Sequence, residues 1–211
     1  MTSTAISAQG STLQVSSTSG AAKNITGIAL GNPTIITSAA HGLSAGDVVS
    51  LAAIGGTTSL NGYTGVIIAK TANTFAIAVD TTGGAAYTSG GTATPASWTP
   101  VSNFKTIKGF DGKTAKLDAT NLSSLAKEYR AGLIDPGNFS FDVDVDVTDA
   151  GQTALQAYRA NATIANFKLT LPNGHTATFA GFVESFPWDG GVDALLTATV
   201  NIIITGPVTI V

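Results

Sequence analysis

The sequence predicts a mainly β protein, an antiparallel β-sandwich or barrel flanked by one α-helix and preceded by a compact all-β module. Residues 138–149 (NFSFDVDVDVTD) alternate between apolar and polar side chains, as expected of a strand with one buried face. Residues 25–79 hold five short apolar runs separated by turn signals such as GNP, HGLSAGD and TAN, a pattern typical of short strands.

Composition narrows the classes of function. The 211 residues include no cysteine, and only 11% are charged, with a net charge of −3. Disulfide and thiolate chemistry are therefore excluded. The sequence also has no basic stripe of the kind that binds nucleic acid. No apolar run approaches the roughly 20 residues of a membrane span, and the first ten residues have no signal-peptide pattern, so no membrane association is expected.

Charge is distributed unevenly along the chain. Residues 1–19 carry none, and residues 20–96 carry only Lys23, Asp47, Lys70 and Asp80. The segments 16–24 (SSTSGAAKN) and 88–100 (TSGGTATPASWTP) are rich in Gly, Ser, Thr and Pro and are interpreted as linkers. These two segments mark the ends of the β module.

The remaining segment holds longer elements. Strands are expected at 102–110, at the acidic run, on both sides of the turn at Asn173-Gly174, and at 193–205, whose polar face carries Thr197, Thr199 and Asn201. A helix is predicted over 148–161, with Thr148 or Asp149 as N-cap and Asn161 as a plausible stop. Leu122, Leu125 and Tyr129 have helical spacing, but that pattern is short and ends at Gly132.

Catalytic chemistry is not indicated. His41 and His175 each lie in or beside a turn, and no Asp/Glu cluster with metal-ligand spacing accompanies them. The run of Asp142, Asp144 and Asp146 is similar to a calcium loop only in spacing, since it lacks the Gly turn and the distal Glu. No enzyme, cofactor or metal is therefore expected, and the aspartates taken alone are interpreted as a solvated strand face.

From residue 97 onward the sequence resembles the major tail tube proteins of long, non-contractile phage tails (siphophages). The resemblance rests on ordered segments: DATNLSSLAKEYRAGLIDPGNFSFDVDVD (118–146), VTDAGQTALQAYRANATIANFKLTLPNG (147–174) and TFAGFVESFPWDGGVDALLTATVNIIITG (178–206). GSTLQVSS (10–17) resembles the first strand of that family, with Leu13 and Val15 facing inward. Residues 1–19 and 97–211 would then form one discontinuous tail-tube domain.

Residues 20–96 depart from that family and are interpreted as an insertion on the tube exterior. TIITSAAHGLSAGDVVSL and LNGYTGVIIAKTANTFAIAV resemble small β-barrel modules akin to the FCCH domain of ubiquitin-activating enzymes. This likeness concerns the fold and implies no enzymatic activity.

The resemblance implies a self-assembling structural subunit whose hexameric rings stack into the conduit for genome ejection. It implies a location in the virion tail after synthesis in the bacterial host cytoplasm. The expected partners are further copies of the chain, the tail terminator, tape measure and distal tail proteins, and double-stranded DNA as passing cargo. Two sets of site residues follow: a lumen lining, made acidic to repel phosphates (Asp142, Asp144, Asp146, Thr197, Thr199, Asn201), and an inter-ring contact loop at 118–137 (Leu122, Leu125, Tyr129).

The alternative is an extracellular or virion-surface adhesin that binds carbohydrate. Composition does not separate the two functions, since both classes are charge-poor and rich in Thr and Gly. Carbohydrate sites usually stack sugars on exposed aromatic rings, however, and residues 20–96 offer only Tyr63, Phe75 and Tyr87. This feature favours the tube.

Overall fold

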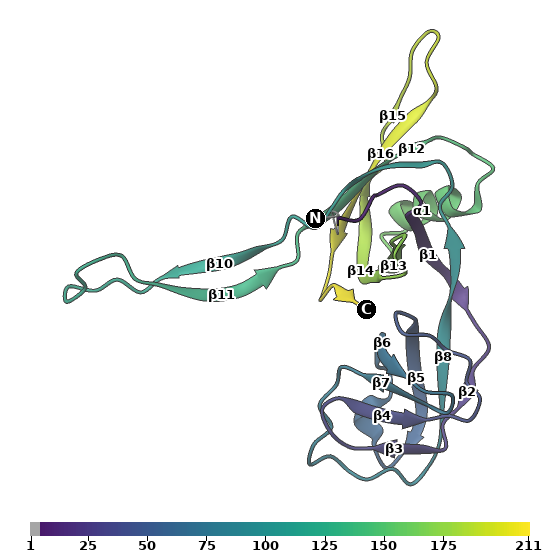
Figure 1. Cartoon of the computed structure of the whole chain (residues 1–211), viewed down its shortest axis with the longest axis vertical. Helices are drawn as coiled ribbons and strands as arrows, with labels where there is room; N and C mark the ends of the chain where they lie inside the picture. Colours follow the sequence, from purple (N-terminus) through teal and green to yellow (C-terminus); the bar gives the residue numbers. More distant parts are fainter. Residues whose placement is uncertain (1–4) are drawn as a thin grey trace.

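The computed structural model describes residues 5–211, apart from the side chains of residues 17–19. Figure 1 shows a body that contains the single α-helix, a smaller β module below it, and two hairpins that project outward. Fifteen strands form one antiparallel sheet, and two more form a separate pair. The predicted mainly antiparallel β fold with one flanking helix is confirmed. Within residues 5–211 the main sheet is open, with β3 and β9 at its edges, so neither predicted barrel closes.

The body is built from seven strands in the spatial order β8-β1-β13-β14-β16-β12-β9. Their apolar side chains alternate with polar ones and bury one shared core, in which the ring centroids of Phe139 and Phe179 lie 5.2 Å apart. Leu13 and Val15 are 1% and 0% exposed, as predicted. The bounds are β1 (Thr12–Ser19), β8 (Ser89–Pro100), β9 (Phe104–Lys108), β12 (Asn138–Asp144), β13 (Ala165–Thr170), β14 (Thr176–Ser185) and β16 (Thr197–Ile204), with the short β17 (Thr209–Ile210) beside β14.

The helix α1 (Ala150–Ala160) packs on this core through Leu155, which is fully buried. Asp149 is the N-cap, and its carboxylate accepts a hydrogen bond from the backbone N–H of Gln152 at 2.8 Å, which satisfies one of the free donors of the first turn. Asn161 is the C-cap, as predicted. No helix among the described residues is long and apolar enough to cross a membrane.

The module has its own core, centred on Ile36, Leu51, Ile67, Phe75 and Ile77, all of which are buried. Its strands follow the predicted apolar runs closely. They are β2 (Lys23–Asn24), β3 (Gly27–Ala29), β4 (Thr34–Thr37), β5 (Val48–Gly55), β6 (Thr64–Lys70) and β7 (Thr74–Ile77), with a 3-10 turn at Thr58–Leu60.

The two segments predicted as linkers are strands, which is a correction. Residues 16–19 belong to β1, and residues 89–100 form β8, the longest strand of the chain. β8 pairs with β5 and β2 of the module at one end and with β1 of the body at the other. Their small polar residues are typical of linkers, yet here they pair with neighbouring strands through backbone hydrogen bonds, which do not depend on side-chain type. The ribbon of β1 and β8 thus connects body and module.

Side chains also join the module to the body. Lys168 of β13 lies with its Nζ 3.3 Å from Oδ1 of Asp47 in the module, and the two side chains are only 14% and 22% exposed. The same Nζ lies 4.6 Å from the ring centroid of Trp98 in β8. The hydroxyl of Thr178, on β14, donates to the carbonyl of Gly46 at 3.0 Å in a buried position. Together these contacts fix the module against β13 and β14.

Two hairpins leave the body (Figure 1). The first, here called the arm, consists of β10 (Lys113–Asp118), β11 (Tyr129–Asp135) and the turn between them. It replaces the predicted loop and the short helical pattern of residues 118–137. The second, here called the distal hairpin, spans residues 188–198 and joins β15 (Trp188–Asp189) to the start of β16.

Candidate functional site

The polar face of β9, β12 and β16 collects most of the predicted site residues. In the register of these strands Asp142 stands between Thr106 and Thr199, Asp144 stands opposite Thr197, and Ser140 stands opposite Asn201. The opposite faces of these strands carry Phe141, Val143, Val200 and Ile202, which are buried in the body core. The period-2 alternation seen in the sequence therefore places five of the six residues predicted to line a lumen on one face.

Asp142 is the most heavily bonded group of this face. Its carboxylate accepts hydrogen bonds from the hydroxyls of Thr106 and Thr199, the latter at 2.6 Å, and lies 3.3 Å from Nζ of Lys108. The threonine hydrogen bonds, with Thr106 foremost, and the nearby Lys108 charge lower the pKa of Asp142 below its usual value of 3.8. The aspartate is therefore ionised at neutral pH.

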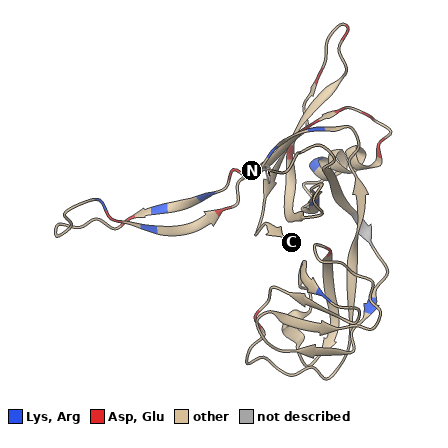
Figure 2. Ribbon diagram, viewed as in Figure 1, with Lys and Arg blue, Asp and Glu red and all other residues tan. Residues whose placement is uncertain are grey.

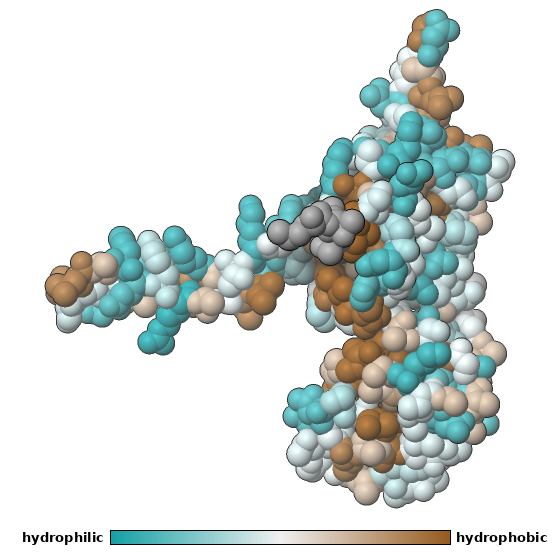
Figure 3. All heavy atoms as spheres, in the orientation of Figure 1, coloured by the Kyte–Doolittle hydropathy of each residue, from teal (hydrophilic) through white to brown (hydrophobic). Residues whose placement is uncertain are grey.

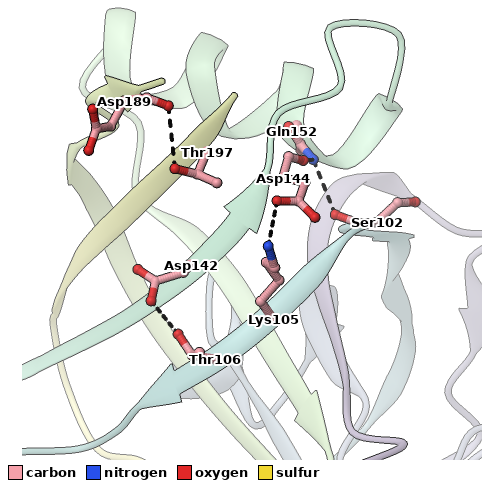
Figure 4. A network of polar contacts seen from close by, with 8 residues as sticks. All are labelled: Ser102, Lys105, Thr106, Asp142, Asp144, Gln152, Asp189 and Thr197. Carbon is pink, nitrogen blue, oxygen red and sulfur yellow. Dashed lines mark hydrogen bonds and ion pairs between the residues drawn. The ribbon is translucent and has the colours of Figure 1, made fainter. Parts of the chain in front are cut away.

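Asp144 is also paired with a base, since its Oδ1 lies 2.8 Å from Nζ of Lys105 (Figure 4). The sequence suggested a row of aspartates with no base beside it, but the neighbouring strand β9 supplies Lys105 and Lys108. The lysines are visible in the sequence NFKTIK at 103–108, but their position beside the aspartates follows only from the pairing of β9 with β12. The face is therefore an array of ion pairs rather than a purely acidic row.

Asp146 does not belong to this array, which corrects the prediction that the strand continues through it. β12 ends at Asp144, and the Asp146 carboxylate accepts hydrogen bonds from the backbone N–H and hydroxyl of Thr148, at 2.8 and 2.7 Å. The cause is Gln152, which is fully buried in the first turn of α1. Its Nε2 donates to the carbonyl oxygen of Asp144 at 2.9 Å, and its Oε1 accepts from the N–H of Asp146. These bonds replace the strand ladder and turn the chain toward the helix.

The β16 residues complete the polar face. The hydroxyl of Ser140 donates to Oδ1 of Asn201 at 2.7 Å, and the Nδ2 group of Asn201 donates to the carboxylate of Glu184. The Thr197 hydroxyl donates to the carbonyl oxygen of Asp189 at 3.3 Å, which ties the face to the distal hairpin (Figure 4). Counted together with Glu184 of the neighbouring β14, the face carries two lysines, Lys105 and Lys108, against three acids, Asp142, Asp144 and Glu184, for a net charge of −1.

The predicted contact residues lie on the arm. Leu122 and Leu125 occupy its tip and are 109% and 105% exposed. The tip is an ordered turn, because Asn121 Oδ1 accepts from the N–H of Ser123 at 2.8 Å and the N–H of Ser124 donates to the carbonyl of Asn121 at 3.0 Å. Tyr129 stands on β11, half exposed, with Nζ of Lys116 3.9 Å from its ring centroid.

The distal hairpin is a second exposed apolar feature, and the sequence analysis missed it. Val192 and Leu195 are 96% and 70% exposed, and Trp188 and Leu196 are also exposed. Figure 3 shows apolar residues at the ends of both projections. The sequence signal was present, since FPWDGG precedes VDALL, but the strand predicted over 193–205 includes Leu195 and Leu196 and does not mark them as exposed.

No group of three or more His, Cys, Asp or Glu side chains in the described part of the chain is placed to hold a metal ion. His41 is buried, with Nε2 3.2 Å from the carbonyl oxygen of Thr74 and Nδ1 accepting from the N–H of Leu43 at 3.0 Å. It therefore holds a module turn in place. The geometry of the polar face and the hairpins suits surface contact.

The chain is similar to two families of known proteins over two overlapping segments. The family model described as lambda phage tail tube protein matches residues 79–211, and the model described as the FCCH domain of ubiquitin-activating enzyme E1 matches residues 31–96. Among solved structures, a chain of the six-fold symmetrised cryo-EM structure of the anti-feeding prophage baseplate is similar, with 12% identity and a TM-score of 0.46 over 55% of this chain and 84% of that one. No curated protein matches the sequence.

Proposed function

Because the chain belongs to the lambda phage tail tube protein family, we propose that it is a structural subunit whose copies form hexameric rings that stack into a DNA conduit. The match over residues 79–211 is the observation that carries this proposal. The other expected partners are the tail terminator, tape measure and distal tail proteins, with synthesis in the host cytoplasm before incorporation into a siphophage tail. If each ring closes through strands of neighbouring subunits, obligate-type interfaces of roughly 2,000 Å² or more are expected.

The polar face of β9, β12 and β16 is proposed to line the lumen. Asp142 and Asp144 would contribute twelve carboxylates to a ring, two from each of six copies. Each carboxylate has a lysine partner within 3.3 Å, so the proposed role of the aspartates is to neutralise those lysines and leave the wall weakly acidic. Free lysines would bind phosphates through counterion release and retard the DNA, whereas a weakly negative wall repels them only within the screening length of about 8 Å.

The module is proposed to project from the outside of the tube. It is attached through β8 and β1 and contacts β13 and β14, whereas the proposed lumen face belongs to β9, β12 and β16 at the far end of the strand order. The carbohydrate-binding alternative receives no support from the module aromatics. Phe75 is 1% exposed, and Tyr63 and Tyr87 pack against the module core.

Negative-stain electron microscopy of concentrated protein, with and without tail-initiator seeds, tests the proposal. Rings with six-fold symmetry that stack into tubes are expected. A chain that stays monomeric under both conditions, as judged by sedimentation of the same samples, would refute it.

A further inference from the structure

We propose that the arm of one subunit docks on the distal hairpin of the next subunit, so that copies join head to tail. This inference rests on the proposed tube function. It adds the receiving surface for the arm and the direction in which subunits follow one another.

The arm needs a partner to be stable. β10 and β11 form a two-stranded sheet of their own, apart from the main sheet, and every β10 residue is exposed. A lone two-stranded hairpin is marginally stable in water. Leu133 and Ile134, at the base of the arm, are 88% and 75% exposed in addition to the tip leucines. An ordered ribbon with apolar side chains along its length is a docking element without its counterpart.

The charges of the two projections are complementary. The arm, residues 113–135, carries four bases, Lys113, Lys116, Lys127 and Arg130, against three acids, Asp118, Glu128 and Asp135 at its base. The distal hairpin carries Asp189 and Asp193, with Glu184 just before it, and the sequence contains no Lys or Arg after Lys168. Figure 2 shows basic residues along the arm and acidic residues on the distal hairpin. Opposite potentials of this kind guide encounter and set register.

The apolar surfaces also match. A cleft of about 480 Å³ lies beside the distal hairpin and is lined by Gly190, Gly191, Ala194 and Leu195, among others, with Asp189 and Lys105 at its polar side. Glycine and alanine leave room there for an incoming side chain. Leu122 or Leu125 of a second copy would fill this space and bury Leu195 at the same time, while the bases of the arm approach Asp189.

The two features stand at opposite ends of one ladder. β12 begins at Asn138, directly after the arm, and ends at Asp144, which pairs with Thr197 beside the distal hairpin. A contact between two different surfaces of the same chain is heterologous, and heterologous contacts repeat from copy to copy until a ring closes or a filament grows. Because the arm and the distal hairpin lie at opposite ends of this strand ladder, successive copies would follow one another along the strand direction.

Charge reversal on the full-length protein tests the docking. Neither Lys113 nor Arg130 forms a side-chain hydrogen bond or ion pair with another described residue, so the double variant Lys113→Glu/Arg130→Glu should fold normally. We expect its critical concentration for tube formation at low salt to rise about tenfold or more, because like charges would now meet at the contact. Combining it in one chain with Asp189→Lys/Asp193→Asn should restore assembly toward the wild-type value. Lys23→Glu/Lys70→Glu, which makes the same change in charge on the module, is the matched control.

The outcomes separate this inference from the proposed function. Arm-reversed chains that assemble as readily as the control would overturn the docking and leave the tube intact. Failure of the hairpin changes to restore assembly would overturn the distal hairpin as the receiving surface. Wild-type chains that never form tubes would overturn both proposals.

A cross-linking measurement gives an independent readout. The chain has no cysteine, so an introduced cysteine is the sole thiol of its chain. One preparation carries Leu122→Cys or Leu125→Cys on the arm, and a second carries Val192→Cys or Leu195→Cys on the distal hairpin. A disulfide between the two preparations then reports contact between arm and distal hairpin. Mixed and oxidised, these preparations should give a mixed disulfide-linked dimer in at least one pairing. Thr82→Cys on the module should give none with either partner. Equal cross-linking of arm and module cysteines would contradict the proposal.

Discussion

Replacing Lys168 by methionine should loosen the junction between body and module. The substitution keeps most of the aliphatic stem but removes the ion pair with Asp47 at 3.3 Å and the cation held over Trp98. Exposed ion pairs contribute about 0–1 kcal/mol, and removal of one partner from a buried pair costs about 3–5 kcal/mol. With side chains 14% and 22% exposed, this pair lies between those limits. A loss of about 2 kcal/mol in the free energy of unfolding is therefore expected.

Urea denaturation followed by tryptophan fluorescence measures this effect. The chain has two tryptophans, so a Trp188→Phe background leaves Trp98 as the single reporter, located at the junction itself. Lys70→Met, on the exposed module surface, is the matched control and should cost less than about 0.5 kcal/mol. A Lys168→Met loss no larger than that of the control, with unchanged Trp98 emission, would refute the view that these contacts fix the module.

Three further predictions follow from the body. Replacing residues 20–95 by Asn-Gly should leave a folded, assembly-competent chain, because Ser19 and Ala96 are paired across the ladder and a two-residue turn closes such a pair; loss of folding would show that the module is integral to the wall. Asp142→Asn should lower stability at pH 7 by about 0.5–1.5 kcal/mol. Because the pKa of Asp142 is depressed in the folded state, that difference should be fully present above its usual value of 3.8 and should disappear as pH falls below 3.8 and through the lower folded-state pKa. A pH-independent difference in urea midpoints would contradict this. Asp142→Asn/Asp144→Asn should change the polar face from a net charge of −1 to +1 and slow DNA ejection from assembled virions; unchanged ejection kinetics would rule out the lumen assignment.

Local patterns predicted the elements whose stability is local. The alternation around Phe139 and Phe141 identified β12, and the Asn173-Gly174 turn identified the β13–β14 hairpin, because both depend on neighbouring residues. The N-cap was narrowed to Thr148 or Asp149 for the same reason, since the cap bonds a residue three positions away.

Features that depend on distant partners could not be predicted in this way. Asp146 continued the alternation, yet Gln152 ends the strand before it through bonds that only the folded helix supplies. β8 has the composition of a linker, and its strand character comes from β1 and β5, which lie far away in the sequence. The pairing of Lys105 with Asp144 across 39 residues likewise required the sheet order. The lumen and contact assignments remain predictions, because both concern copies of the chain beyond the single subunit.

The ribbon of β1 and β8 has a mechanical consequence. Both strands leave the body side by side toward the module. A force that pulls the module outward therefore pulls both strands in the same direction and does not separate them from each other. The load passes instead to the pairing of β1 with β13, from Thr12 opposite Thr170 to Val15 opposite Phe167. That ladder is loaded along its strands, so its hydrogen bonds resist in parallel and do not open one after another. Drag on the module would therefore reach the wall of the body as shear across β13.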